Sequence, residues 1–338
     1  MIVWLAALAF AGDVFYADAA AGGVRVFDTR NLTNAYYSPT PHCVAVAPGF
    51  GMAFDETSGR LWMFQHLGAP WNSDRLGWVD VNTGQEYCPY YNSSTYSTSM
   101  SFDPGLNTVV GFEAGAGHGM WDLFNLRLIQ DTGIVAASAA DWFEPGGYHL
   151  VLGRDGFFAV DGVTAPTFLA AMPADVIQPW SGEMAWDADT GVLWLFEYGY
   201  AWGIDPTNWT VVAEVASFGL AVGGAGSIDD VPNQTPELLV SGVCPGTVYV
   251  TAVDATPGGH VRIASGTRRG VTSVPSGNCQ GAPVGLANPR ARVDLVANSA
   301  GIAATRIQAT PGMCGQVLLQ ALDVDSCLTT SVGTVPAP

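Results

Sequence analysis

Polar side chains recur at one place in a pattern that repeats along the first two-thirds of the chain. They are Asp18, Gln65, Glu113 and Glu197, with Gly153 and the neighbouring Arg154 at that place in a weaker copy. Carboxylates at symmetric positions on one face could bind a cation, because hard cations take carboxylate oxygens, or could surround a sugar. The alternative is that each side chain accepts N–H bonds from the loop after it. We favour this structural interpretation and predict no metal site.

The segments that follow these positions, 66–72, 115–121 and 198–202, are rich in histidine, tryptophan and tyrosine. If they share a face, exposed Trp and Tyr side chains can stack on sugar rings or fill a protein interface. The alternative is that these aromatic side chains pack between neighbouring sheets. We predict a binding surface formed by His66, Trp71, Glu113, His118, Trp121, Glu197, Tyr200 and Trp202.

Signatures of known catalytic sites are absent from the sequence: there is no HExxH, GxSxG, complete GxGxxG or P-loop motif. The five histidines are scattered, and no cofactor is expected. A glycosidase with two facing carboxylates remains an alternative. Its candidate acids are Glu113, Asp141, Glu183 and Glu197.

Three aspartates, Asp55, Asp103 and Asp187, open tight turns at matching places. Asp187, Asp189 and Gly191 have the spacing of a calcium loop, but Tyr198 stands where that loop needs a bidentate Glu. The sequence therefore favours turns in which the aspartate carboxylate binds the backbone.

An internal repeat positions all of these residues. Segments 52–65, 100–113 and 184–197 align without gaps, and 140–152 is a weaker copy. Each reads as strand, tight turn, strand, and the copies start roughly 44 residues apart, which is typical of a propeller blade. The chain opens with half a unit, 13–18 and 24–28, whose missing half is expected around 217–222. We predict an all-β fold in which residues 12–231 form a five-bladed β-propeller closed by the N-terminal strands.

Segments 14–18 and 24–28 resemble a unit of the YVTN or NHL-like propellers of bacterial secreted and surface proteins. The resemblance implies a propeller fold for the first two-thirds of the chain. Such propellers serve as binding scaffolds and as enzymes, so it says little about function.

Composition changes sharply near residue 230. Ten of the eleven Trp lie between Trp62 and Trp209, and after Asp230 the only aromatic residue is Tyr249. Up to Asp230 there are 6 Arg and 25 acidic residues, and beyond it 6 Arg and 5 acidic residues. The proline-containing segment 229–236 is the predicted linker.

Residues 237–338 contain short apolar runs separated by turn signals, at 237–240, 247–253, 260–263, 291–296, 302–307 and 316–322. This spacing predicts a small β-sandwich that needs disulfides as staples. Cys244-Pro-Gly and Thr256-Pro-Gly-Gly resemble the Ig-like C-terminal modules of large secreted bacterial proteins.

Six cysteines indicate an oxidising compartment: Cys43, Cys88, Cys244, Cys279, Cys314 and Cys327. Pairing within domains joins Cys43 to Cys88 and leaves the pairing of the last four open. Residues 1–11 form an apolar run ending in Ala-Phe-Ala, which predicts a signal peptide, with a first buried strand as the alternative. No later run approaches the roughly 20 apolar residues of a membrane span. The expected location is secreted or cell surface.

The net charge of −18 opposes binding to nucleic acids and anionic lipids, which are held chiefly by basic side chains. All 12 basic residues are Arg, which excludes Schiff-base lysine chemistry. We predict a secreted, non-enzymatic recognition protein whose propeller face binds a glycan or a protein partner. A structural surface protein and, third, a glycoside-active enzyme are the alternatives.

Overall fold

The computed structural model describes residues 13–18, 23–38, 50–65, 75–81, 83–88, 97–113, 119–125, 127–135, 137–176, 183–197, 199–216, 221–228 and 236–338. Within these ranges the chain consists of β-strands, turns and one short 3-10 helix, η1 (Glu144–Gly146), with no α-helix. The predicted all-β class is confirmed.

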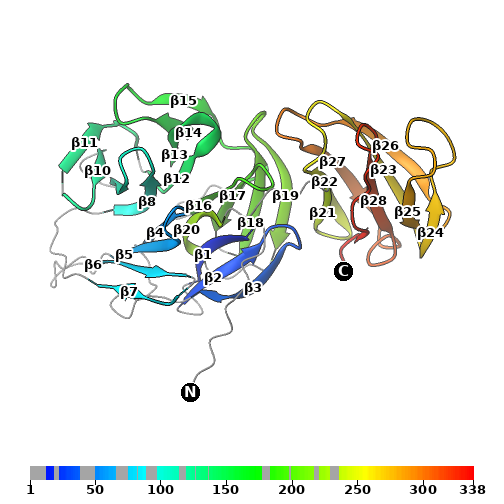
Figure 1. The fold of residues 1–338 in the computed structure, drawn as a ribbon, viewed down its shortest axis with the longest axis horizontal. Coiled ribbons are helices and arrows are strands. Elements are labelled where there is room, and N and C mark those ends of the chain that lie inside the picture. Colours follow the sequence, from blue (N-terminus) through cyan, green and yellow to red (C-terminus); the bar gives the residue numbers. More distant parts are fainter. Residues whose placement is uncertain are drawn as a thin grey trace, which may run out of the picture.

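The described part of residues 13–228 forms five antiparallel sheets of four strands each (Figure 1). The first sheet contains β20 (Ala221–Ile228), β1 (Asp13–Asp18), β2 (Gly23–Asp28) and β3 (Thr33–Ser38). The second contains β4 (Phe50–Asp55), β5 (Arg60–Gln65), β6 (Arg75–Asp80) and β7 (Glu86–Tyr87). The third contains β8 (Ser97–Asp103), β9 (Thr108–Glu113), β10 (Gly119–Asp122) and β11 (Arg127–Asp131).

The last two of these sheets follow the same order along the chain. The fourth contains β12 (Ala139–Phe143), β13 (Tyr148–Gly153), β14 (Gly156–Val160) and β15 (Thr167–Ala170). The fifth contains β16 (Glu183–Asp187), β17 (Val192–Glu197), β18 (Tyr200–Asp205) and β19 (Thr210–Ala216). The first sheet is the exception, because its strand β20 comes from the far end of this region and pairs with β1.

One edge strand of each sheet faces the middle of this region. Each of β20, β4, β8, β12 and β16 contacts the next, and β16 contacts β20, so the contacts make a closed cycle. Figure 1 shows these five strands near the centre and β3, β7, β11, β15 and β19 toward the periphery. Apolar clusters fill the spaces between neighbouring sheets.

In each sheet, the strand next to the inner strand is buried on both faces, which explains its apolar run. In β17 the five residues Val192, Leu193, Trp194, Leu195 and Phe196 are all at most 2% exposed. A strand covered on one face only would alternate, whereas a strand between two sheets is apolar throughout. The peripheral strands β11 and β15 are half-buried or exposed, so burial decreases from the centre outward.

The C-terminal part, residues 236–338, contains two sheets that share one apolar core. The three-stranded sheet contains β21 (Glu237–Gly242), β22 (Gly246–Val253) and β27 (Ala303–Ala309). The four-stranded sheet contains β26 (Arg290–Val296), β23 (His260–Gly266), β28 (Leu318–Asp323) and β29 (Gly333–Thr334). A separate hairpin contains β24 (Arg269–Ser273) and β25 (Pro283–Leu286).

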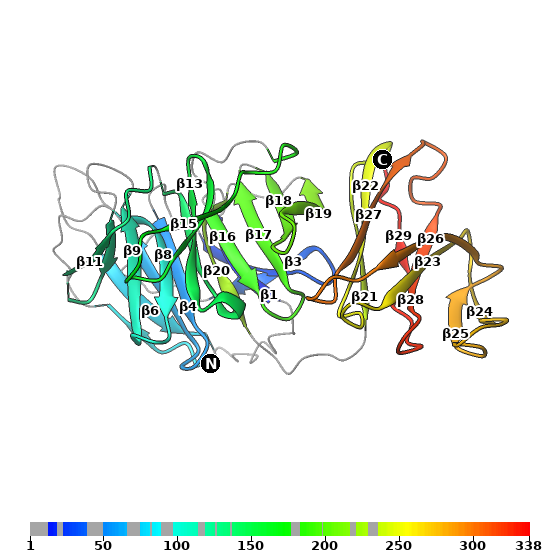
Figure 2. The same ribbon diagram turned by 90° about the horizontal axis from the view of Figure 1, so that it is seen from above.

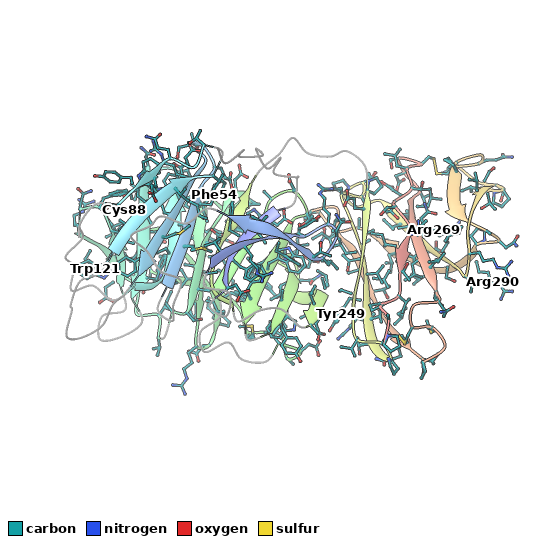
Figure 3. The ribbon with its side chains drawn as sticks, turned by 90° about the horizontal axis from the view of Figure 1, so that it is seen from below. Phe54, Cys88, Trp121, Tyr249, Arg269 and Arg290 are labelled. Atoms are coloured by element: carbon teal, nitrogen blue, oxygen red, sulfur yellow. A yellow bond between two sulfur atoms is a disulfide. The ribbon has the colours of Figure 1, made fainter. Side chains whose placement is uncertain are left out.

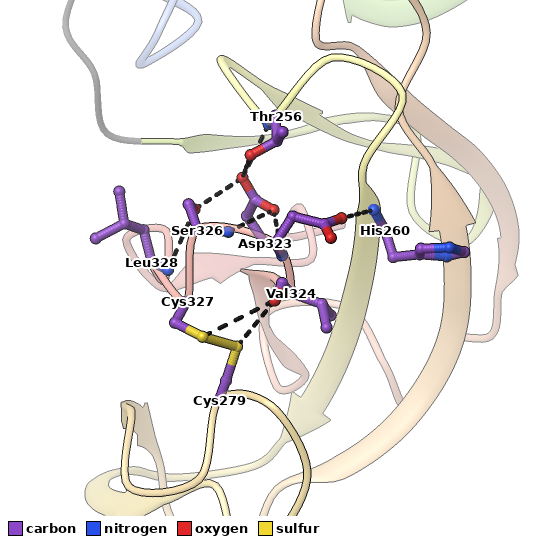
Figure 4. The surroundings of a disulfide bond; sticks show 9 residues. Thr256, His260, Cys279, Asp323, Val324, Ser326, Cys327 and Leu328 are labelled. Atoms are coloured by element: carbon purple, nitrogen blue, oxygen red, sulfur yellow. Dashed lines mark hydrogen bonds between the residues drawn. A yellow bond between two sulfur atoms is a disulfide. The ribbon is translucent and has the colours of Figure 1, made fainter.

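Disulfides fasten the C-terminal part at two places. Cys244 pairs with Cys314 beside the shared core, and Cys279 pairs with Cys327 (Figure 4). These bonds decide the pairing that the sequence left open. Cys88 is also disulfide-bonded, and its predicted partner Cys43 lies outside the described residues.

The two parts of the chain lie side by side and touch along the fifth sheet (Figure 2). Leu239, Val253 and Ile302 of the C-terminal part belong to an apolar cluster that also contains Trp194. At its margin the Arg30 guanidinium lies 2.8 Å from Glu237 Oε1 and 3.3 Å from Asp254 Oδ2. The interface therefore has an apolar centre and a partly buried ionic edge.

Candidate functional site at one face of the five sheets

Strand direction divides the connections of residues 13–228 into two faces. The connections from the second to the third strand of a sheet, and from the fourth strand to the next sheet, lie at one face, which we call the loop face. It carries the longest connections, 39–49, 66–74, 88–96 and 171–182. Within the five sheets, the connections from the first to the second strand and from the third to the fourth strand lie at the opposite face, the turn face, and are short, such as 56–59 and 206–209. The strands that precede the predicted binding segments, β5, β9 and β17, end at this face.

The structure describes the predicted binding residues in part. His66, Trp71 and His118 lie outside the described residues. Glu113 and Glu197 end β9 and β17 at the loop face, where Glu113 pairs with Ser97 and Glu197 with Tyr200, but their side chains are outside the described part. Their assignment to a binding surface stays a prediction.

At the matching position of the first sheet, the end of β1, Asp18 forms an ion pair. Its Oδ2 lies 2.9 Å from Arg25 Nε, and Asp18 is 2% exposed. At the matching position of the fourth sheet, the end of β13, the residue is Gly153, which has no side chain. Among these positions, Asp18 is the one carboxylate whose surroundings are described, and it is bonded to an arginine side chain of the neighbouring strand β2. The predicted bonds from backbone N–H groups of the following loop stay a prediction.

Trp121, on β10, is half-buried rather than free at the surface. It packs against the apolar cluster between the second and third sheets, beside Trp62 and Met100. Its indole nitrogen is buried and has no hydrogen-bond partner within the described ranges. This arrangement matches the alternative of packing between sheets.

Trp202 is a core residue, which corrects its assignment to the binding surface. It is 2% exposed and belongs to the cluster between the fourth and fifth sheets. Tyr200, two residues earlier on the same side of β18, is half-buried and stacks on Trp202 with ring centroids 5.3 Å apart. Tyr200 therefore keeps some exposed surface, whereas neighbouring sheets cover Trp202.

The turn face is organised by aspartates. Asp55 Oδ1 accepts from Ser58 N, Asp103 Oδ1 from Leu106 N, and Asp187 Oδ1 from Asp189 and Thr190 N. Gly59 and Gly191 close two of these turns with φ of 66°, a conformation that favours glycine. The aspartates therefore serve the backbone in the manner expected from their spacing.

Asp141, a candidate glycosidase acid, is buried between the inner strands β12 and β16. Its carboxylate accepts the Trp142 N–H at 2.9 Å and the Trp186 N–H at 2.6 Å. Burial raises the pKa of Asp141 to about 7, against the opposing effect of these two hydrogen bonds. The carboxylate joins neighbouring sheets and is 4% exposed, so it is closed to a glycosidic bond.

A Ser–His–Asp arrangement lies between the third and fourth sheets. His149 Nδ1 is 2.9 Å from Ser101 Oγ, and His149 Nε2 is 3.1 Å from Asp103 Oδ2. Burial lowers the pKa of His149, so the neutral ring donates to Asp103 and accepts from Ser101. Ser101 and His149 are both fully buried, which excludes the serine as a nucleophile for an outside substrate. The cluster is a hydrogen-bonded bridge between sheets.

The fold resembles several solved structures, whereas the sequence matches no known family. No protein-family model matches the sequence, and no curated protein matches it. A crystal structure of a nidogen/laminin complex is similar over 71% of this chain and 88% of that chain, with 14% identity and a TM-score of 0.42. The β-propeller domain of Cps50 (Swd1) from Myceliophteria thermophila is similar over 68% and 90%, with 10% identity and a TM-score of 0.39. A structural genomics protein of unknown function from Bacteroides thetaiotaomicron is similar over 71% and 64%, with 9% identity and a TM-score of 0.40.

Metal and membrane sites were also sought in the described ranges. Within them, no group of three or more His, Cys, Asp or Glu side chains could hold a metal ion. No helix of the described chain is long and apolar enough to cross a membrane.

Sequence analysis missed three polar side chains that bind other side chains in the fold: Ser101, Arg25 and His149. Each binds a partner on a different strand, so no local sequence motif marks the pair.

Proposed function

We propose that the chain is a secreted, non-enzymatic recognition protein whose loop face binds a glycan or a protein partner. In this proposal the five sheets are blades of one five-bladed propeller, residues 12–231, related to the YVTN or NHL-like propellers. Pairing of β20 with β1 closes the ring. Residues 1–11 are a signal peptide, and residues 237–338 are an Ig-like β-sandwich that acts as a spacer or docking module.

The observation that best supports this proposal is that the connections at the loop face are longer than those at the turn face. Long connections at the loop face include the predicted binding segment 66–72, whereas the turn face is closed by short Asp-capped turns. Loops on a rigid sheet scaffold are where binding residues concentrate. Tyr200, a half-buried residue paired with Glu197 at the end of β17, extends this surface onto described residues.

Two observations favour binding over catalysis. Asp141 is removed from the set of candidate glycosidase acids by its burial and its two backbone hydrogen bonds. The Ser101–His149–Asp103 cluster is closed to substrate in the same way. The remaining glycosidase candidates, Glu113, Glu183 and Glu197, begin or end strands at the loop face and fall under the same test as the binding residues.

A thermal-shift screen of the full chain against a glycan library and against extracellular protein fractions tests the proposal. A ligand at a hundredfold excess over its Kd should stabilise the protein by about 2.7 kcal/mol. The shift should be lost in Trp71→Ala, because that side chain is the most exposed aromatic anchor expected in segment 66–72.

Leu106→Ala is the matched control. Leu106 is 55% exposed in a turn of the opposite face, so its loss should leave the ligand shift unchanged. If Leu106→Ala abolishes the shift and Trp71→Ala does not, the loop face is the wrong surface. A glycan consumed with turnover, with activity lost in Glu113→Gln or Glu197→Gln, would establish the enzymatic alternative instead.

A further inference from the structure

A polar cleft of about 460 Å³ lies at one end of the four-stranded sheet in the C-terminal part. The register pairs Ser265 with Arg290 and Gly266 with Leu318, so β23 ends here and β26 and β28 begin here. Thr267, Arg268, Asn288 and Arg290 are among the residues that line it. Figure 3 shows Arg290 at the end of the C-terminal part remote from the five sheets. The volume lies within the range of small-molecule sites.

The charge of this cleft is opposite to that of the chain as a whole. Arg268 and Arg290 both line it, and none of the described residues that line it is acidic. Neither guanidinium makes a hydrogen bond or ion pair within the described part of the chain. By contrast, Arg262 pairs with Asp294 and Arg306 pairs with Asp175.

The acidic residues of the C-terminal part are all engaged elsewhere. Glu237 and Asp254 face Arg30, and Asp294 binds Arg262. Asp323 accepts from Thr256 and Ser326, and Asp325 accepts from the His260 N–H. None of these five carboxylates therefore neutralises the two arginines, which are free to bind an external one.

The other polar groups of the cleft suit hydroxyl groups. Thr267 and Asn288 are exposed, and their side chains make no hydrogen bond within the described ranges. A hydroxyl and an amide provide both donors and acceptors. A large polyanion is disfavoured, because the net charge of −18 repels it beyond the cleft. A small ligand with a single carboxylate and several hydroxyls fits both features.

We propose that this cleft binds a small hydroxylated carboxylic acid of the uronic acid type. Arg268 and Arg290 hold the carboxylate through charge-assisted hydrogen bonds, which are stronger than neutral ones. Thr267 and Asn288 bind the hydroxyls. The site is separate from the loop face, so it does not depend on the recognition function proposed for that face.

Titration calorimetry of the full chain with D-glucuronate, D-glucose and propionate tests the proposal. D-glucuronate should bind at least about tenfold more tightly than D-glucose, which lacks the carboxylate, and than propionate, which lacks the hydroxyls. Arg268→Gln and Arg290→Gln should each weaken D-glucuronate binding by about tenfold or more. Binding should also weaken as salt is added, because the arginines are exposed.

Arg262→Gln is the matched control, since Arg262 is an exposed arginine of the same sheet that is already paired with Asp294. It should leave D-glucuronate binding unchanged. The proposal is overturned if D-glucuronate does not bind, if D-glucose binds equally well, or if Arg262→Gln weakens binding as much as Arg268→Gln. Melting curves of the three variants confirm that each is folded.

Discussion

The carboxylates of Asp103 and Asp141 are both buried, but different groups reach them. Burial alone would raise the pKa of Asp103, yet hydrogen bonds from His149 and from the Leu106 N–H outweigh it and lower the pKa. Asp141 receives two backbone N–H groups and is more deeply buried, so burial prevails and raises its pKa to about 7. The same residue type thus stays ionised at one inter-sheet contact and holds a proton at another.

The raised pKa of Asp141 predicts a pH-dependent stability of definite sign. Between its ordinary pKa of 3.8 and about 7, the folded protein keeps the proton that the unfolded chain loses. The contribution of Asp141 to the free energy of unfolding should therefore fall as pH rises through this range and level off above it. One such group contributes a slope of at most about 1.4 kcal/mol per pH unit.

Urea denaturation between about pH 5 and about pH 7 measures this slope. Asp141→Asn should change this slope by up to the equivalent of one proton. Asp187, Glu214 and Asp254, whose pKa values burial also raises, contribute with the same sign in wild type and variant alike. Asp161→Asn is the control, because hydrogen bonds lower the pKa of this exposed turn carboxylate. An unchanged slope in Asp141→Asn would contradict the assignment.

At the scale of elements, local signals in the sequence predicted the hairpins of the repeat well. The aligned segments became β4–β5, β8–β9 and β16–β17, because an aspartate at the strand end and a Gly or Asn with positive φ set each turn locally. The half unit at the N-terminus pairs with β20 at Ala221–Ile228, slightly later than expected.

Features that depend on distant neighbours could not be predicted. The hairpin β24–β25 was missed because β24 alternates between exposed and half-buried residues and carries no apolar run. Trp202 was placed at the surface because a tryptophan near a loop looks the same in sequence whether or not another sheet covers it. The positive charge of the cleft at Arg268 and Arg290 could not be predicted either, because it depends on which partners the fold gives to the nearby carboxylates.

The β24–β25 hairpin provides the prediction at this scale. Its strands pair only with each other among the described strands, and Cys279–Cys327 fastens it to the turn after β28. The Gly285 N–H also donates to Gln320 Oε1 at 2.8 Å. In Cys279→Ser/Cys327→Ser, amide exchange should quicken within residues 269–286 while β22 keeps its protection, because only the hairpin loses its tether.

The second disulfide serves as the comparison. Cys244 and Cys314 are 4% and 6% exposed and lie in the shared core. Their replacement by serine should lower the stability of the whole C-terminal part, by about 4 kcal/mol on the chain-entropy account. Hydrogen exchange by mass spectrometry distinguishes the local effect from the global one. Equal protection losses in β22 for both double variants would refute the distinction.

At the scale of the whole molecule, we expect the contact between the two parts to couple their unfolding. An apolar cluster spans the contact, Thr251 Oγ1 donates to the Val212 carbonyl, and Asn298 Nδ2 donates to Asp205 Oδ2 at 2.8 Å. Each of these contacts joins an element of the fifth sheet to the C-terminal part. We therefore expect a single thermal transition for the wild-type chain.

Arg30 tests that coupling, because its side chain is 8% exposed and faces both Glu237 and Asp254 across the interface. Arg30→Ala leaves two carboxylates together without their cation, and breaking a buried ion pair costs on the order of 3 kcal/mol. Differential scanning calorimetry should then resolve two transitions. Arg306→Ala removes the other ion pair between the parts, to Asp175, but both side chains are more than half exposed, so its cost should stay below about 1 kcal/mol. If the two variants have equal effects, burial of Arg30 does not govern the coupling between the parts. If the transition splits in Arg30→Ala alone, the coupling depends on this buried ion-pair edge of the interface.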